Sequence, residues 1–336
     1  MTWTPGMERR DDWLAQTTEP ILDPRRDIVD PHHHLWVHGD TVYDLAALWS
    51  DTGAGHNVVQ TVYVECRSFY GRGASPSLQP VGETAHVARL AAGMAQHPDR
   101  AQIAGIVAHA DLRDPNLDAV LDAHRAAGGP LFKGIRHSGA YDPDPAGLIV
   151  PARGTPGLYA DPDFRRGVAR LGARGLSYDT WHYHTQTAEF LALAQAVPDT
   201  VLVLDHLSTP LGVGRFAGRR DAIFDTWRRD MAALAKCPNV VAKLGGLAMP
   251  DNGWGWHLRA APPGSEEIAQ AFAPWFHHMI DHFGPARCMF ESNFPVDRTA
   301  LGYPVLWNAF KRMAAQYDQA AQAMMFSGTA RATYRL

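Results

Sequence analysis

Cysteine is scarce in this chain of 336 residues. Cys66, Cys237 and Cys288 are odd in number, far apart in the sequence, and not arranged in CxxC pairs. They fit free thiols in a reducing compartment better than a disulfide framework or a structural zinc site. We therefore expect a cytoplasmic protein.

Long hydrophobic runs are missing as well. No uncharged stretch exceeds 13 residues, whereas a membrane-spanning helix needs about 20 apolar residues. Residues 1–12 mix acidic and basic side chains and lack the apolar core of a secretory signal. The sequence thus predicts neither a membrane span nor export.

No charge of one sign dominates the chain. It has 35 acidic and 31 basic residues, a formal net charge of −4, and no long basic run. This balance disfavours nucleic acid or an anionic membrane as the main partner and leaves a small-molecule substrate. With 46% hydrophobic and 20% charged residues, the chain is globular rather than disordered.

Short β-branched runs alternate with Ala- and Leu-rich segments of helical character. Eight runs have the composition of strands, at residues 27–31, 58–65, 103–109, 131–136, 176–180, 201–205, 240–244 and 287–292. Helix-like segments lie between them, among them residues 83–96, 117–127, 164–173, 189–197 and 222–236. Near-continuous apolar runs such as VLVL predict strands that are covered on both faces.

Eight such units without a break in composition predict an α/β protein, a single-domain (β/α)8 TIM-type barrel. An open, doubly wound sheet is the alternative, but it would need a Gly-rich phosphate loop where the sequence has PHHHLW. We assign residues 26–336 to the barrel. Residues 1–25 are assigned to an N-terminal arm that packs on the barrel or on a second subunit, which would suit a homo-oligomer. Residues 245–264, rich in Gly, Pro and Trp, predict a loop beside the active site.

Reactive side chains of a TIM barrel come from the C-terminal ends of its strands. Nearly every predicted strand here ends near a His, Arg, Lys or carboxylate, namely Asp30, His32, His34, Glu65, His109, Arg136, His137, His182, Asp205, His206, Lys243 and Glu291. Strands without a function would more often run into Gly, Ser and Asn turns. This concentration is the main evidence from residue types for an enzyme.

His32 and His34 are the sharpest pair in the sequence, which has 17 histidines in all. Residues two apart in a strand point to the same side, so both imidazoles can face the barrel mouth. Such a pair can share a divalent ion, most often Zn²⁺. A His-rich loop with ordinary hydrogen bonds is the alternative. A third histidine at a later strand end, His182, favours the metal site.

Three motifs of this sequence resemble the amidohydrolase superfamily: DPHHHLW at residues 30–36, VLDH at 203–206 and ESNFPVD at 291–297. They are most similar to the amidohydrolase-related branch with sugar-lactone and dicarboxylate-lactone hydrolases. The resemblance spans about residues 27–336 and implies a (β/α)8 barrel. It places His32 and His34 on strand one, His182 on strand five, His206 on strand six and Asn293 on strand eight.

Asn293 departs from the pattern of the superfamily. An Asp usually stands there and binds metal or takes the proton of the attacking water, whereas Asn is no base and a weaker ligand. A base could come instead from Glu65, Asp205, Glu291 or Asp297. Some relatives in this branch are thought to work without metal, using histidines and arginines to polarise the substrate, so both routes stay open.

The other candidate residues each have a structural alternative. Glu65 could act in catalysis or pair with Arg67, and Arg136 could bind a substrate carbonyl or carboxylate or form an internal ion pair. Trp254 and Trp256 could stack on a substrate or only anchor their loop. Residues predicted to bind substrate are Arg67, His137, Tyr141, Trp254 and Trp256.

The sequence predicts a hydrolase of a small carbonyl ester, in the first place a lactonase. A divalent ion, with Zn²⁺ expected, held by His32, His34 and His182, or those imidazoles alone, would polarise the carbonyl for attack by water. The predicted catalytic residues are Glu65, Arg136, His206 and Asn293. A non-oxidative aromatic-acid decarboxylase of the same superfamily is one alternative. A scaffold or partner subunit without catalysis is another, which Asn293 keeps open.

Overall fold

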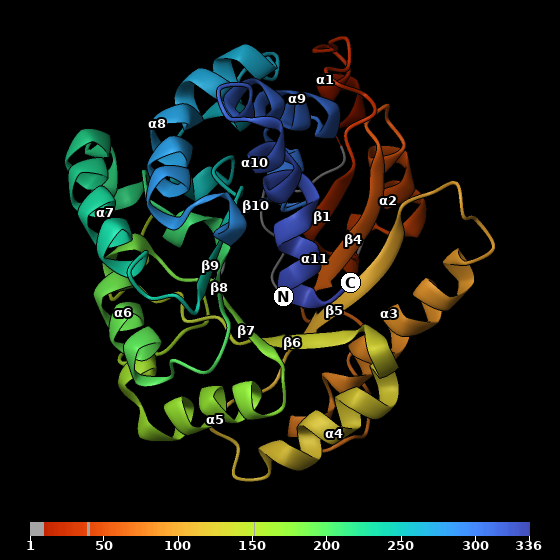
Figure 1. The fold of residues 1–336 in the computed structure, drawn as a ribbon, viewed down its shortest axis with the longest axis vertical. Coiled ribbons are helices and arrows are strands. Elements are labelled where there is room, and N and C mark those ends of the chain that lie inside the picture. The colour runs from red at the N-terminus through yellow and green to blue at the C-terminus, as the bar shows by residue number, and fades with distance from the viewer. Residues whose placement is uncertain (1–9, 39–40, 151) are drawn as a thin grey trace.

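Eight parallel strands form a ring at the centre of the molecule (Figure 1). The structure is a computed structural model that describes residues 10–38, 41–150 and 152–336. The strands pair in the order β1 (Ile28–His33), β4 (Val58–Val64), β5 (Gln102–Ala108), β6 (Phe132–Arg136), β7 (Ser177–Thr180), β8 (Leu202–Leu204), β9 (Val240–Leu244) and β10 (Cys288–Phe290). The ring closes between its first and last strands, because Asn293 N donates to His32 O at 3.0 Å and His34 N donates to Phe294 O at 2.8 Å.

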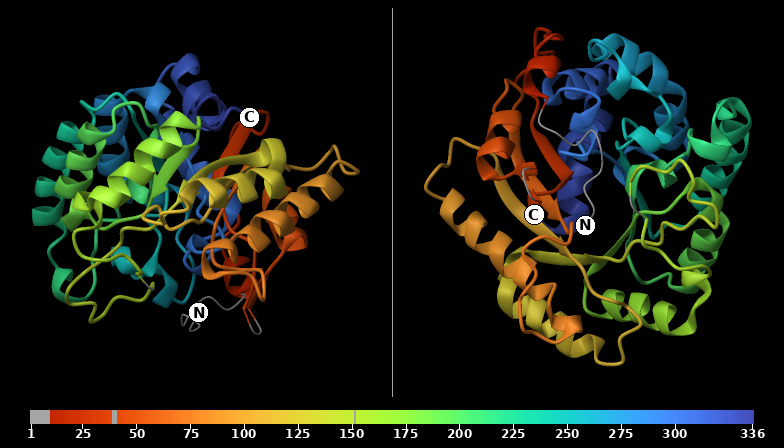
Figure 2. Two further views of the ribbon diagram at one scale, coloured as in Figure 1. Left: turned by 90° about the horizontal axis from the view of Figure 1, so that it is seen from below. Right: turned by 180° about the vertical axis from the view of Figure 1, so that it is seen from behind.

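Helices surround this ring of strands (Figure 2). Those that connect the strands of the ring are α2 (Leu45–Thr52), α3 (Val81–Met94), α4 (Leu117–Gly128), α5 (Pro162–Ala173), α6 (Thr187–Ala196), α7 (Arg220–Leu234) and α8 (Ser265–Phe283). The other helices and strands are α1 (Asp11–Leu14), the small antiparallel pair β2 (Trp36–His38) and β3 (Thr41–Tyr43), α9 (Tyr303–Ala314), α10 (Gln319–Ala323) and α11 (Thr329–Tyr334). The predicted (β/α)8 barrel is confirmed, and the open doubly wound sheet is wrong.

Local sequence signals explain where several elements begin and what they bury. Asp161 accepts hydrogen bonds from Asp163 N and Phe164 N, and Pro162 occupies the first turn, so α5 begins there. Every residue of β1, β7, β8 and β10 is buried. Strands covered by helices outside and side chains inside need this composition.

The N-terminal end of the barrel is filled by valines and by the C-terminus of the chain. The apolar cluster inside the ring contains Val29, Val62, Val64, Val107, Val203, Met289, Ala330 and Tyr334. Helix α11 lies across this end of the ring (Figure 1), and Lys133 Nζ donates to Arg335 O at 2.9 Å. The Tyr334 hydroxyl reaches the barrel interior and donates to Asp179. In the described part of the chain, this end of the barrel is therefore closed, and the C-termini of the strands lie at the opposite end.

Residues 10–19 lie against the loop that precedes α8 and the first residue of that helix. Trp13 Nε1 donates to Arg259 O at 3.0 Å, Thr17 Oγ1 to Pro262 O at 2.9 Å, and Ser265 N to Glu19 Oε1 at 2.6 Å. The start of the predicted arm, residues 1–9, lies outside the described residues, and its boundary near residue 25 stays a prediction.

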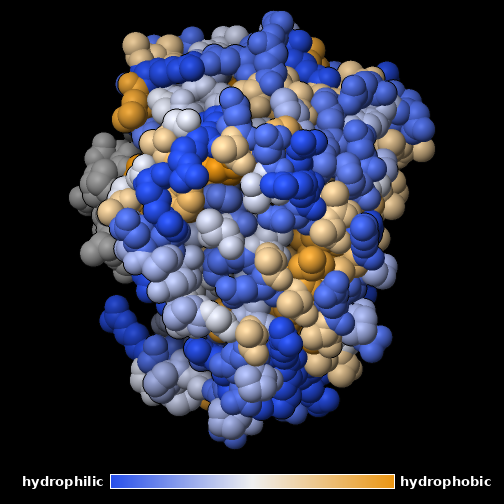
Figure 3. Space-filling view, turned by 90° about the vertical axis from the view of Figure 1, so that its left-hand side faces the viewer, coloured by the Kyte–Doolittle hydropathy of each residue, from blue (hydrophilic) through white to orange (hydrophobic). Residues whose placement is uncertain are grey.

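The character of the surface and the state of the cysteines can be compared with the predictions from the composition. On the side of α6 and α7 the surface is largely hydrophilic, with small scattered apolar areas (Figure 3). In the described part of the chain, no helix has the length and apolar character needed to cross a membrane. Cys66, Cys237 and Cys288 are free and buried.

Replacing Tyr334 by Phe tests how much the C-terminal closure stabilises the barrel. Loss of the buried hydroxyl takes a donor from Asp179, so we expect the free energy of unfolding to fall by about 1–2 kcal/mol. Urea denaturation measures it. The matched control is Tyr317→Phe, whose hydroxyl lies in a more exposed contact with His277 and should change stability by less than about 0.5 kcal/mol. Equal effects of the two variants would contradict this account.

Candidate active site

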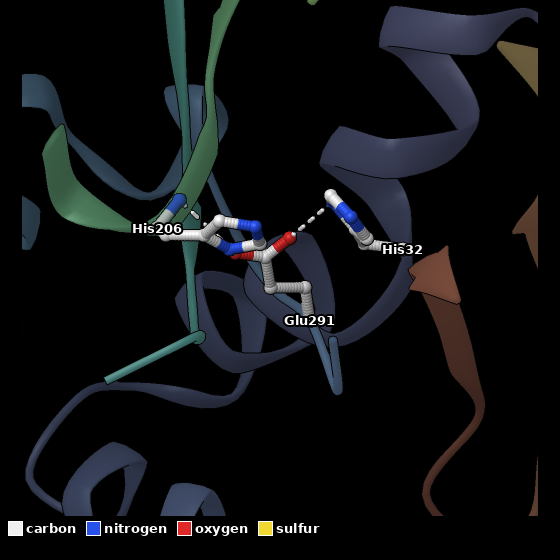
Figure 4. A group of neighbouring side chains, drawn as sticks. All are labelled: His32, His206 and Glu291. Carbon is white, nitrogen blue, oxygen red and sulfur yellow. Dashed lines mark hydrogen bonds and ion pairs between the residues drawn. The ribbon is translucent and has the colours of Figure 1, made fainter. Parts of the chain in front are cut away.

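A carboxylate at the barrel mouth lies between two imidazoles from different strands (Figure 4). Glu291 follows β10, His206 follows β8, and His32 belongs to β1. His206 Nδ1 lies 2.6 Å from Glu291 Oε1, and His32 Nδ1 lies 2.9 Å from Glu291 Oε2. All three side chains are buried. The ends of three strands therefore meet in one polar group.

Glu291 fixes the tautomer of His206. Burial alone would raise the pKa of Glu291, but the adjacent His206 and His32 lower it to about 2, so Glu291 is ionised at neutral pH. A carboxylate only accepts hydrogen bonds, so the proton of a neutral His206 lies on Nδ1. Its Nε2 therefore carries a lone pair. This arrangement of imidazole and carboxylate is the one that general-base histidines use.

The backbone around His206 is held in an uncommon conformation. His206, Leu207, Ser208 and Thr209 have φ values of 56°, 53°, 59° and 35°, all in the left-handed region. Side chains outside the turn support it, because Trp227 Nε1 donates to Leu207 O and Trp181 Nε1 donates to Thr209 Oγ1. Strain of this kind persists only where the surrounding structure holds it, and it is frequent at functional sites.

Two glycines after β9 leave room for this pair of side chains. A Cβ on Gly246, whose φ is +69°, would lie 2.3 Å from His206 Nδ1. A Cβ on Gly245 would lie 2.4 Å from Glu291 Cγ. Because real Cβ contacts are not this short, any other residue at 245 or 246 would displace His206 or Glu291.

His32 and His34 direct their Nε2 atoms at each other, 3.3 Å apart. His34 Nδ1 lies 2.9 Å from Val64 O, and since a carbonyl only accepts, the proton of a neutral His34 is on Nδ1 and its Nε2 has a lone pair. A proton or a cation must lie between the two atoms. Zn–N bonds of about 2.0–2.1 Å place tetrahedral ligands roughly 3.4 Å apart, so the observed spacing fits a shared ion.

His182 has a ring nitrogen without a partner. Its Nδ1 lies 3.1 Å from the Tyr159 hydroxyl, while its Nε2 is buried and makes no hydrogen bond to any described residue. Burial lowers the pKa of His182 to about 3 and the pKa values of His32 and His34 well below the usual value. All three imidazoles are thus neutral, which is the form that binds metal.

Among the described residues, the group of three possible ligands whose atoms lie within 4.8 Å of one another is His32, His206 and Glu291, so the structure does not bring the predicted set of His32, His34 and His182 together at that distance. In that group, however, the His206 proton already fills the space between His206 Nδ1 and Glu291. The His32–His34 pair therefore fits an ion better, and Glu291 fits the role of orienting the two imidazoles beside it.

The barrel interior carries more negative than positive charge. Its two permanent cations among the described residues, Arg136 and Lys243, lie among four carboxylates, Glu65, Asp179, Asp205 and Glu291. Lys243 Nζ is 2.9 Å from Asp179, 3.0 Å from Asp205 and 3.2 Å from His32 Nδ1. A surplus of buried negative charge favours binding of a divalent cation.

Glu65 and Arg136 form a buried pair next to His34. Arg136 Nε donates to Glu65 Oε1 at 3.0 Å, and Nη2 donates to Glu65 O at 2.6 Å. Arg136 Nη1 lies 3.8 Å from Asp205 and makes no hydrogen bond to any residue described. The ion pair that was the structural alternative for both residues is thus present, and part of the guanidinium remains for a ligand.

The side-chain amide of Asn293 is bonded to another carboxyl group, that of Asp297. Its Nδ2 donates to Asp297 Oδ1 at 2.9 Å, and its φ is +55°. Burial raises the pKa of Asp297 to about 7, although His206 and Asn293 act in the opposite direction. The residue that replaces the usual Asp thus holds a second carboxyl group in place.

The predicted substrate-binding residues are placed differently from one another. Arg67 lies in the loop after β4, near Glu65. His137 packs on Phe164, and its Nδ1 accepts from Leu112 N at 3.2 Å. Tyr141 lies in the loop after β6, where its backbone N donates to Gln186.

Trp254 and Trp256 stack on each other with centroids 5.3 Å apart. The Arg220 guanidinium lies over the Trp254 ring, with its Cζ 3.6 Å from the ring centroid. Both tryptophan rings also contact Phe272 of α8. These contacts are those of rings that anchor their loop. A role in substrate binding for His137, Tyr141 and the two tryptophans stays a prediction.

Sequence reasoning missed the role of Lys243 and Asp179. Lys243 stood at a predicted strand end without an assigned partner, and Asp179 was one of several polar residues in the fifth strand. Each is the single charged residue of its strand segment, VVAKL or LSYDT, and this was the available signal. Inward-facing charges of this kind must be paired.

Gly246→Ala tests whether this position serves His206. The variant should be less stable than the wild type for two reasons: an alanine is unfavourable at this positive φ, and its Cβ would clash with the His206 imidazole and displace it. Gly255→Ala is the matched control, since Gly255 has the same φ of +69° and open space around its Cβ position. We expect Gly246→Ala to be about 1–3 kcal/mol less stable than the control, measured by urea denaturation. Equal losses of stability in the two variants would show that residue 246 does not contact His206.

Comparison with known proteins shows relatives that match over nearly the whole chain. The chain is 31% identical over 331 residues to the uncharacterized protein y4mH of Sinorhizobium fredii, with 92% of this chain and 98% of the relative covered. It is 30% identical to an L-fucono-1,5-lactonase of Burkholderia multivorans, with 92% and 96% covered.

A crystal structure of an amidohydrolase from Burkholderia multivorans with bound zinc superimposes with a TM-score of 0.73 at 27% identity, covering 92% of this chain and 99% of that chain. The family described as Amidohydrolase matches residues 29–336. The resemblance predicted from three sequence motifs is therefore confirmed, and the chain belongs to the amidohydrolase family.

Proposed function

We propose that the protein hydrolyses a lactone, with His206 as the general base. The observation that carries this proposal is the 2.6 Å contact between His206 Nδ1 and the ionised Glu291, which leaves a lone pair on Nε2 beside His32. The similarity to an L-fucono-1,5-lactonase supports a six-membered sugar lactone as the substrate.

His206 can both accept and return the proton that is transferred in this reaction. Nε2 takes a proton from water as the water oxygen attacks the lactone carbonyl carbon. The ring C–O bond then breaks, and the imidazolium returns the proton to the departing alkoxide oxygen, which yields a hydroxy acid. Glu291 stabilises the positive charge that His206 carries between the two steps.

Arg136 stabilises the negative charge on the carbonyl oxygen in this proposal. Its Nη1 is the part of the guanidinium that is not hydrogen-bonded to Glu65. A donor in a buried site is worth more than one in water, since there is no solvent to reorganise around the charge. Glu65 holds the guanidinium in place.

A divalent ion, Zn²⁺ in the first place, would be held by His32, His34 and His182. When bound, it supplies a Lewis acid that withdraws electron density from the substrate carbonyl. The spacing of the two Nε2 atoms and the negative interior support an ion between His32 and His34. His182 is proposed as the third ligand because its buried Nε2 has no partner among the described residues, and it would have to move toward the pair, since the three do not lie within 4.8 Å of one another in this structure. Asn293 is a positioning residue in this scheme, because its amide is occupied by Asp297.

His206→Asn tests the general base. The Asn amide can still donate to Glu291, but nothing replaces Nε2, so kcat for L-fucono-1,5-lactone should fall by about 10²–10⁴-fold. Acid release followed at constant pH measures the rate. His278→Asn on α8 is the control and should retain full activity. Release of CO₂ from aromatic acids without lactone hydrolysis would instead identify a decarboxylase.

Metal content tests the ligand set independently of activity. Protein purified without chelators should contain about one divalent ion per chain, and His32→Asn should lose most of it, while His278→Asn keeps it. Elemental analysis by mass spectrometry measures this. A wild-type protein that hydrolyses lactones with no bound metal would assign the polarisation of the carbonyl to the imidazoles and Arg136.

A further inference from the structure

The loop after β4 places two polar atoms next to the site that have no partner. Glu65 is 4% exposed, and its Oε1 accepts from Arg136. Its Oε2 is buried and accepts no hydrogen bond from any described residue, and the same is true of the Tyr70 hydroxyl. Buried polar atoms are nearly always satisfied, and an unpaired carboxylate oxygen is costly. A ligand with hydroxyl groups would satisfy both atoms.

Arg67 lies between these residues in the sequence and has no ion pair or hydrogen bond within the described structure. Its charge nevertheless acts on both neighbours. Burial would raise the pKa of Glu65, but Arg136, His109 and Arg67 lower it. Burial and Glu65 raise the pKa of Tyr70, and Arg67 opposes them. The guanidinium therefore acts electrostatically on both groups and remains available to donate.

Glu83 in the first turn of α3 holds this loop in its conformation. Its Oε1 accepts from Cys66 N at 3.2 Å, from Ser68 N at 2.8 Å and from the Tyr63 hydroxyl at 3.0 Å. These bonds flank Arg67 on both sides and support its φ of +62°. Because a buried carboxyl group bonds the backbone amides of the loop, the loop is held in one conformation before any ligand binds.

Glu65 also lies next to the groups that are proposed to act in the reaction. His34 Nδ1 donates to Val64 O, directly before Glu65, and Arg136 bonds Glu65. A substrate whose carbonyl lies at His34 and Arg136 therefore extends its other ring substituents toward this loop. The atoms offered there are an acceptor from Glu65, donors from Arg67, and a hydroxyl on Tyr70 that can do both.

We propose that Glu65, Arg67 and Tyr70 form a subsite for the ring hydroxyl groups of the substrate, which selects neutral polyhydroxylated lactones over lactones that carry a carboxylate. This inference rests on the proposed lactone hydrolysis and adds its specificity. A hydroxyl can donate to Glu65 Oε2 and accept from Arg67 at once. A substrate carboxylate could not donate to Glu65, and its charge would be repelled by that oxygen.

Binding of non-hydrolysable lactams tests the subsite without relying on turnover. The three probes are a hydroxylated δ-lactam with the ring configuration of L-fucono-1,5-lactone, unsubstituted δ-valerolactam, and a δ-lactam bearing a carboxylate. Calorimetry should show that the wild-type protein binds the hydroxylated probe at least about tenfold more tightly than δ-valerolactam. Tyr70→Phe should reduce this preference about tenfold. Tyr317→Phe, distant from the barrel mouth, should leave it unchanged.

Glu65→Gln gives a second readout that a merely structural role would not produce. Removing the negative charge should strengthen binding of the carboxylate-bearing lactam relative to the hydroxylated one. Urea denaturation of each variant confirms that it folds. Unchanged preferences in Tyr70→Phe and Glu65→Gln, or a wild-type preference for the carboxylate probe, would overturn the subsite. Lactam preferences as expected, without hydrolysis of any lactone, would instead refute the lactonase and leave the subsite standing.

Discussion

One buried carboxylate determines the arrangement of the site. Glu291 lies 2.6 Å from His206 and 2.9 Å from His32, so it joins the ends of β8, β1 and β10 across the mouth of the barrel. An ionised group in such a place is stable only with donors around it. His206 provides one at Nδ1, and its own tautomer is fixed in return. Two glycines after β9 and four left-handed residues after β8 serve this contact, since each would otherwise move Glu291 or His206.

A second group of buried charges, around Lys243, is connected to this contact through His32. Lys243 lies between Asp179, Asp205 and His32, and Tyr334 donates to Asp179 from the end of the barrel that the C-terminus closes. A continuous set of hydrogen bonds and ion pairs therefore runs from the last helix to the first histidine. Pairing on this scale is required because a single unpaired charge in the barrel would cost several kcal/mol. Buried atoms without a hydrogen bond to any described residue remain at Glu65 and Tyr70 in the loop after β4, as they do at His182 after β7.

The fold was predictable from the sequence because its determinants are local. Runs such as VLVL and VVQTVYV predict buried parallel strands at any position, and the eight predicted strands coincide with the eight observed. The candidate residues were predictable to the extent that they stand at strand ends, as His32, Glu65 and His206 do. Their partners were not, since pairing depends on the register of strands that are distant in the sequence. Lys243 and Asp179 illustrate this, because only the closed ring brings them together. The glycines at 245 and 246 likewise gain their meaning only once His206 and Glu291 are placed.

Asn293 shows how a missing carboxylate is compatible with hydrolysis in this barrel. An Asp at this position would add a further negative charge next to Glu291, in an interior that already has a surplus. With Asn, the amide donates to Asp297 instead, and burial keeps the pKa of that carboxyl near 7. In the mechanism that we propose, His206 transfers the proton and Glu291 stabilises the charge that His206 then carries. The proposed base therefore follows strand six, while its supporting carboxylate follows strand eight, where the superfamily usually has its Asp. Asn at position 293 is compatible with hydrolysis because this mechanism needs no carboxylate there.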